Sequence, residues 1–209
     1  MLKNIFAVAV IAAFAASAAA GQCKDDYQNL RLSEAAKSCP IEATQGNAEA
    51  QLSLGVMHER GLGVKQDSKE AAKWYRLAAG QGNAIAQFNL GVMYGNGEGV
   101  KQDHADAAKW YRLAAEQGNA AAQNNLGVMH ELGMGVKQDL VEMLKWHHKA
   151  AAQNDPLSQF NIGKAYEEGL GVRQNAAEAM KWYRLAANQG DARARSRLAA
   201  LQKQADDNR

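Results

Sequence analysis

Three things are scarce in this sequence: excess charge of one sign, large apolar side chains and cysteine. The formal net charge is +2, which gives no electrostatic case for nucleic-acid binding, because that requires lysine and arginine clustered on one face. The hydrophobic fraction of 47% is inflated by alanine, so the chain is poorly suited to filling one deep globular core. Thin layers of stacked helices are the architecture that this composition favours.

The two cysteines, Cys23 and Cys39, both lie near the N-terminus. In an oxidising compartment, such an even pair is expected to form a disulfide, and two free structural thiols are the alternative. Closing a loop of about 15 residues stabilises a protein by about 3 kcal/mol in the chain-entropy model.

The first 20 residues have the pattern of a secretory signal peptide. Lys3 provides the positive charge, residues 5–14 form the apolar segment, and small residues at 17–20 predict cleavage after Ala20. A retained membrane anchor and a lipoprotein modified at Cys23 are the alternatives, although Gln22 is a poor residue before a lipidated cysteine. We expect a periplasmic protein, or alternatively a secreted one, without a stable membrane span after cleavage.

An internal repeat of 36 residues determines the architecture. It places tryptophan at positions 74, 110, 146 and 182 and glycine at positions 55, 91, 127 and 163 without insertions. The structural residues that we predict from it are Trp74, Trp110, Trp146, Trp182, Gly55, Gly91, Gly127 and Gly163. We expect the glycines to let helix backbones approach and each tryptophan to act as a core wedge.

Each repeat is predicted to contain two helices. The first runs from about Ala48 to Arg60 with Asn47 as its N-cap, and two glycines in residues 61–64 end it. Asp67 then begins the second helix in a pattern that resembles a capping box with Glu70. The predicted fold is therefore all-α, a right-handed α/α superhelical solenoid of helix-turn-helix repeats.

The repeat register divides the chain into seven segments. The N-terminal segment after the signal peptide is a degenerate half-repeat in which Pro40 is expected to kink or end the helix. At the other end, Arg193, Arg195 and Arg197 are expected to form a polar lid. The predicted segments are a signal peptide (1–20), an N-terminal cap with a disulfide (21–42), repeats 1 to 4 (43–79, 80–115, 116–151 and 152–187) and a C-terminal capping helix with its tail (188–209).

The repeat unit resembles the Sel-one-like repeat family, which is related to the tetratricopeptide repeats. One unit reads AIAQFNLGVMYGNGEGVKQDHADAAKWYRLAAEQGN, and the resemblance covers residues 43–204. It implies an exported bacterial adaptor that assembles protein complexes. Cysteine-rich relatives described as β-lactamases carry a cysteine pair in each repeat, and this chain lacks those pairs.

In paired-helix solenoids the first helices line the concave surface, so their open face is the predicted partner-binding site. Apolar groups there would anchor a peptide or helix, and stacked asparagines would bind an extended backbone. As an alternative, the asparagines satisfy neighbouring backbone groups and the phenylalanines pack between repeats. The predicted residues are Leu52, Ser53, Phe88, Asn89, Asn124, Asn125, Phe160 and Asn161.

No arrangement of residues indicates catalysis or metal binding. The five histidines have no zinc or copper spacing, and the sequence contains neither Ser-x-x-Lys nor Gly-x-Ser-x-Gly. We predict a monomeric, non-enzymatic protein without cofactors that binds another protein or peptide as a scaffold or regulatory adaptor. The alternatives are a secreted factor that contacts host cells and a β-lactam-binding or β-lactamase-like activity on the cell wall.

Overall fold

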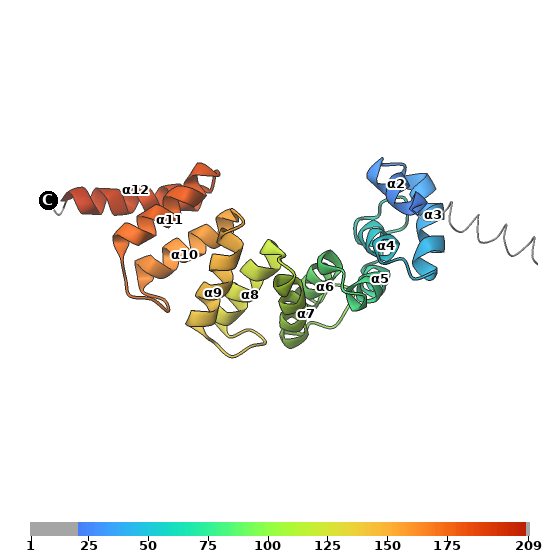
Figure 1. Cartoon of the computed structure of the whole chain (residues 1–209), viewed down its shortest axis with the longest axis horizontal. Coiled ribbons are helices and arrows are strands. Elements are labelled where there is room, and N and C mark those ends of the chain that lie inside the picture. The colour runs from blue at the N-terminus through green and yellow to red at the C-terminus, as the bar shows by residue number, and fades with distance from the viewer. Residues whose placement is uncertain (1–20, 208–209) are drawn as a thin grey trace, which may run out of the picture. The chain divides into compact units, whose positions relative to one another are not determined.

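The computed structural model describes residues 21–207, which form helices joined by short loops (Figure 1). The proposed signal peptide lies outside this part. The chain divides into two compact units, the first ending at Gln102 and the second beginning at Asp103. Unit 1 contains α2 (Gln22–Gln28), α3 (Leu32–Thr44), α4 (Ala48–Arg60), α5 (Ser68–Gly80) and α6 (Ala84–Asn96). Unit 2 contains α7 (His104–Glu116), α8 (Ala120–Leu132), α9 (Leu140–Ala151), α10 (Pro156–Glu168), α11 (Ala176–Asn188) and α12 (Ala192–Asp207).

The pairs α4–α5, α8–α9 and α10–α11 are complete helix-turn-helix repeats. In each unit, successive helices pack against one another along the chain (Figure 1). The predicted all-α repeat architecture is confirmed. None of the helices in residues 21–207 combines the length and apolar character that a membrane span requires.

The first helix of each repeat begins and ends where its capping residues predict. In α4, the side chain of Asn47 accepts hydrogen bonds from the backbone amides of Glu49 and Ala50. The helix ends at Gly61, whose φ of 69° is in the left-handed region that glycine tolerates. The predicted bounds of this helix are confirmed.

The second helix begins at the predicted N-cap, but only half of a capping box is present. Asp67 accepts hydrogen bonds from the amides of Lys69 and Glu70. The return bond is absent because the amide of Asp67 donates to the carbonyl of His58 at 2.9 Å. The carboxylate of Glu70 pairs with Lys73 instead, at 3.3 Å.

The break between α9 and α10 has asparagine where the other breaks between repeats have glycine. Asn154 takes the place of the usual glycine and has a φ of 64°, which asparagine accepts more readily than most residues. Pro156 then occupies the first turn of α10, where its missing amide hydrogen is not needed.

The N-terminal cap consists of α2 and α3, joined by the Cys23–Cys39 disulfide with a Cα–Cα distance of 4.5 Å. The prediction that Pro40 kinks or ends its helix is wrong as to the end, because α3 continues to Thr44. The helix is held on both sides of the proline, by the disulfide at Cys39 and by the buried side chain of Ala43.

In repeats 1 and 4, the tyrosine after the tryptophan, rather than the tryptophan itself, fills the space between the paired helices. Tyr75 and Tyr183 are fully buried, whereas Trp74 and Trp182 are half-buried. A β-carbon on Gly163 would lie 2.7 Å from the ring of Tyr183, so the glycine is needed for this ring. The predicted tryptophan wedge is wrong as a general rule, because Trp110 is also half-buried and only Trp146 is buried, at 3% exposure.

Candidate protein-binding site

The asparagines predicted to bind a partner already have partners within their own unit. In unit 1, the hydroxyl of Tyr75 donates to Glu59 Oε2 at 2.7 Å and is also hydrogen-bonded to Asn89. Burial and the bond to Glu59 raise the pKa of Tyr75. Asn125 is hydrogen-bonded in the same way to Tyr111 in unit 2. These asparagines join one repeat to the next.

Two of the predicted surface residues are buried, which corrects their assignment to an open face. Ser53 is 9% exposed and Asn124 is 7% exposed. Asn124 Oδ1 accepts hydrogen bonds from Ser158 Oγ and Asn161 Nδ2, both at 3.1 Å. Asn124 therefore lies on the side of α8 that faces α10, the next first helix, and that helix covers it.

The aromatic and aliphatic positions on this face are half-buried. The ring of Phe160 lies 5.4 Å from the ring of Tyr183, and the Arg193 guanidinium carbon lies 4.4 Å from the centroid of the Phe160 ring. Leu52 and Phe88 are also half-buried. The apolar surface of the first helices is therefore smaller than the sequence predicts, and part of it is covered by the terminal helix.

Repeat 3 has a different polar arrangement because His147 replaces the buried tyrosine. Its ring lies against Gly127 and makes no hydrogen bond to Glu131, the residue that corresponds to Glu59 of repeat 1. Glu131 instead accepts a bond from Lys164 at 2.8 Å, which raises the pKa of that lysine. Neither ring nitrogen of His147 has a hydrogen-bond partner among the described residues.

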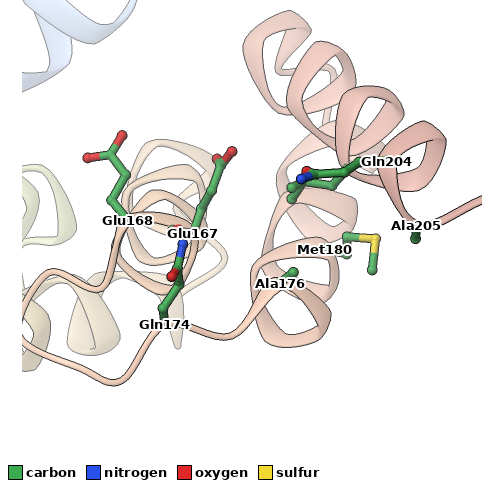
Figure 2. A pocket seen from close by; sticks show the side chains of 8 residues that line it. Glu167, Glu168, Gln174, Ala176, Met180, Gln204 and Ala205 are labelled. Carbon is green, nitrogen blue, oxygen red and sulfur yellow. Dashed lines mark hydrogen bonds between the residues drawn. The ribbon is translucent and has the colours of Figure 1, made fainter. Parts of the chain in front are cut away.

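The C-terminal end of unit 2 has a groove of about 710 Å³. Figure 2 shows Glu167, Glu168 and Gln174 on one side of it and Met180 and Gln204 on the other. The groove lies among α10, α11 and α12, and its lining is completed by Ala176, Leu201 and Ala205.

The groove corresponds to a position that is filled in the preceding repeat. There, the loop after α10 crosses the start of α9, and a β-carbon on Gly171 would lie 2.5 Å from the carbonyl oxygen of Leu140. Leu170 and Val172 of this loop pack against the cluster that contains Met143, Leu144 and Ala165. One period later, Ala176, Met180 and Leu201 take the places of Leu140, Leu144 and Ala165, and all three line the groove.

Within residues 21–207, no loop of this kind covers α11, because α12 continues past the position where first helices end. Ala205 stands where the earlier repeats have Gly61, Gly97, Gly133 and Gly169, each with a φ between 68° and 76°. Alanine favours helix and does not readily adopt positive φ. The helix therefore extends to Asp207, and no residue of the described part of the chain covers the receiving side chains of α11, which line the groove.

The two acidic residues of the groove differ in their surroundings. Glu167 accepts hydrogen bonds from the Tyr183 hydroxyl at 2.6 Å and from Arg197 Nε at 3.1 Å, and Arg197 also forms an ion pair with it. Arg197 therefore joins α12 to α10, and the predicted polar lid of Arg193, Arg195 and Arg197 stays a prediction. Glu168 is exposed and is available to a positively charged group on a bound partner.

Within residues 21–207, no group of three histidine, cysteine, aspartate or glutamate side chains is placed to hold a metal ion. Buried tyrosine, glutamate and asparagine side chains serve the contacts between helices. The geometry offers a surface for binding by shape and apolar contact.

Comparison with known proteins identifies the repeat. The Sel1 repeat profile matches residues 48–83, 84–119, 120–155 and 156–191. The chain belongs to the Sel1 repeat family. Sel1 repeats generally mediate protein binding, and the uncovered groove lies beside the last of the four Sel1 repeats. A search of curated protein sequences finds no significant match.

Solved Sel1 repeat structures share the fold. A Sel1 repeat protein from Oxalobacter formigenes is 35% identical with a TM-score of 0.80, and the match covers 85% of this chain and 73% of that one. The protective antigen c5321 of uropathogenic Escherichia coli, which has an SLR fold, is 39% identical with a TM-score of 0.84, and 88% of this chain is covered. This chain spans only 41% of the antigen's length. The cysteine-rich protein B of Helicobacter pylori is 25% identical with a TM-score of 0.50, over 64% of this chain and 96% of that protein.

Sequence reasoning missed the groove because it is defined by a loop that does not form. The signal that would have located it is the replacement of the repeat glycine by Ala205, together with an intact set of receiving positions at Ala176, Met180 and Leu201. These substitutions become visible when the 36-residue register is continued past repeat 4 into the C-terminal helix.

Proposed function

We propose that this Sel1 repeat protein is an exported, non-enzymatic adaptor that binds a partner protein in the groove at the end of unit 2. The observation that carries the proposal is the correspondence between this groove and the filled loop site of the preceding repeat. A groove with apolar residues at the positions that receive a loop in the preceding repeat is a candidate interaction site.

The filled site indicates the chemistry of the partner. The loop that fills it is Leu170-Gly171-Val172. Gly171 lies against the carbonyl of Leu140, the first residue of α9, and an aliphatic side chain packs on either side of the glycine. Arg173 follows in this loop, and a basic residue at that place in a partner would complement the exposed Glu168. We therefore propose a turn of the form aliphatic-glycine-aliphatic-basic as the ligand.

The ligand is proposed to come from another protein rather than from a second copy. In each unit, the Gly-x-Gly loops of this chain are already seated on their own receiving helix. The four seated pairs are Gly63 on Leu32, Gly99 on Ser68, Gly135 on His104 and Gly171 on Leu140. A second copy would have to unfold a repeat in order to supply one.

The face of the first helices is a second proposed contact surface, considered in each unit separately. In unit 1 its half-buried residues are Leu52, Phe88 and Asn89, and in unit 2 they are Asn125, Phe160 and Asn161. Since these side chains also hold neighbouring helices, we propose that they support binding at the edges rather than supply the principal anchors.

Export to the periplasm is proposed from the N-terminal sequence and is supported by the disulfide in the cap. A second candidate function is a released factor that contacts host cells. It is supported by the similarity to an antigen of a uropathogenic strain. Separating periplasm from culture medium distinguishes the two, because the adaptor is expected in the periplasmic fraction and the host factor in the medium.

A labelled peptide with the sequence of residues 169–175, GLGVRQN, tests the groove directly. Fluorescence anisotropy should show saturable binding to the full exported protein. Met180→Lys should weaken binding by about tenfold or more, because it places a charge in the apolar floor. Leu185→Lys is the matched control on the same helix, since Leu185 is 47% exposed and does not line the groove.

A second peptide, in which alanine replaces the central glycine, should bind more weakly, because the filled site has no room for a β-carbon. Equal binding of the two peptides, or equal effects of the Met180 and Leu185 substitutions, would remove the groove from the proposal.

A further inference from the structure

Glu42 is a buried carboxylate at the N-terminal cap. It is 3% exposed and lies on α3, where it faces the start of α2. Its oxygens accept hydrogen bonds from the backbone nitrogen of Cys23 at 2.7 Å, the backbone nitrogen of Gly21 at 3.1 Å and Asn47 Nδ2 at 3.2 Å. In the uncut chain all three donors are neutral.

A buried charge is costly unless an opposite charge compensates it. No lysine, arginine or histidine in residues 21–207 forms an ion pair with Glu42. The nearby cations have other partners, because Arg31 pairs with Asp26 at 2.9 Å and Lys24 lies 4.0 Å from Glu49. The carboxylate of Glu42 is therefore without a counter-ion in the uncut chain.

We propose that cleavage of the Ala20–Gly21 bond creates this counter-ion, and that the α-ammonium group of mature Gly21 pairs with Glu42. The nitrogen that would become the new N-terminus already lies 3.1 Å from Glu42 Oε2. This inference rests on the export part of the proposed function. It adds that processing completes the N-terminal cap.

The cleavage is a hydrolysis by a signal peptidase. One water molecule is consumed and the amide C–N bond breaks. The hydroxyl goes to Ala20, which leaves as a carboxylate and releases a proton, while the Gly21 nitrogen gains one hydrogen. The resulting amine takes up a further proton near neutral pH and becomes an ammonium group. The pair, of which Glu42 is the buried member, then has one positive and one negative charge.

The ion pair and the disulfide would hold α2 at neighbouring points, Gly21 and Cys23. A paired α-ammonium has a pKa above the ordinary range of an α-amino group, about 7.7–8.0. Its stabilising effect is fully present below that range and is lost as the pH rises through the raised pKa of the folded state. The charged neighbours Lys24, Asp26, Arg31 and Glu49 are already engaged with each other.

The test uses the protein exported from the complete gene. The intact mass identifies the first residue, and the pH dependence of α-amine acetylation by acetic anhydride gives the pKa of the new N-terminus. We expect a chain that begins at Gly21 with a raised α-amine pKa. In Glu42→Gln, the pKa should return to the ordinary range.

A second variant covers the case in which Glu42→Gln does not fold. Insertion of one asparagine after Ala20 keeps Glu42 but moves the ammonium group one residue away. We expect an ordinary α-amine pKa and a lower melting temperature than in the wild-type protein, with the difference disappearing at a pH where the wild-type amine is deprotonated.

The outcomes separate this inference from the proposed function. An exported protein that begins at another residue overturns only the pairing, as does an ordinary α-amine pKa in a chain that begins at Gly21. A precursor that is never cleaved overturns both the pairing and the export part of the proposed function. Peptide binding in the groove of unit 2 is independent of all three results.

Discussion

The ring of Tyr183 lies against the backbone of Gly163, so closely that a β-carbon at position 163 would be 2.7 Å from the ring. Tyr75 has the same relationship to Gly55 in unit 1. The glycine removes a side chain from the first helix so that an aromatic ring of the second can occupy the space. This contact, together with the tyrosine–glutamate hydrogen bond, fixes how the two helices of a repeat pack.

Gly163→Ala should destabilise unit 2 by about 1–3 kcal/mol, because the ring or the helix must move to accommodate the new methyl group. Urea unfolding followed by circular dichroism measures the change. Gly80→Ala is the matched control, since Gly80 lies within α5 and nothing surrounds its added β-carbon. That substitution should stabilise the protein by about 0.4–1 kcal/mol. Equal destabilisation by both would contradict the role of Gly163.

His147 should make the stability of unit 2 sensitive to acid. Burial lowers its pKa from 6.5 to about 4, and His148 and Lys164 act in the same direction, while Glu131 and Asp155 oppose the shift. The unfolded chain therefore binds a proton more readily than the folded chain. The contribution is complete above pH 6.5 and is lost as the pH falls towards 4, a change of about 3 kcal/mol.

His147→Tyr restores the residue found at this place in the other repeats and isolates the effect. The difference in unfolding free energy between this variant and the wild type should grow as the pH is lowered from 7 to 4.5. A constant difference across this range would show that His147 does not cause the acid sensitivity. Glu131 corresponds to Glu59 of repeat 1, so the new tyrosine hydroxyl could donate a hydrogen bond to it, as Tyr75 does to Glu59.

Reduction of the Cys23–Cys39 disulfide should destabilise the N-terminal cap by about 3 kcal/mol, because the bond closes a loop with a sequence separation of 16. Cys23→Ser together with Cys39→Ser should reproduce the effect without reductant. Amide hydrogen exchange in α2 and α3 reports the loss, with α12 as an internal reference. Unchanged exchange in α2 and α3 would mean that packing alone holds the cap.

The sequence was sufficient for the elements whose ends are fixed by local chemistry. Asn47, Asp67 and Gly61 mark helix ends through backbone hydrogen bonds and a positive φ, and these depend on only a few neighbouring residues. The 36-residue period then repeats the same ends along the chain. Asn154 followed the same principle as the glycines that it replaces.

The sequence was insufficient where the structure depended on which way a side chain points from its helix or on contacts between helices. Trp182 and Tyr183 are adjacent, and a rotation of about 100° decides which of them faces Gly163. The pattern alone gave that place to tryptophan. Pro40 was judged by its local effect on a helix, whereas the disulfide and the core hold α3 on both sides of it.

The open face was overestimated for a related reason. Asn124 lies on the side of its helix that the next first helix covers, and its hydrogen bonds to Ser158 and Asn161 cross from one repeat to the next. The spacing of residues along one helix shows which of them share a face, but it does not show which face a neighbouring helix covers. The groove was missed because the effect of Ala205 is indirect. Alanine at this position lets the helix continue where a glycine would end it and begin a loop.

The most direct test of the groove is a nuclear magnetic resonance titration of the exported protein, labelled at its methionine methyl groups, with the GLGVRQN peptide. The Met180 methyl resonance should move in a saturable way, because Met180 lines the groove. The resonance of Met143, buried in the same unit, should stay in place. Binding that leaves Met180 unchanged, or no binding at millimolar peptide, would contradict the assignment of this groove as the partner site.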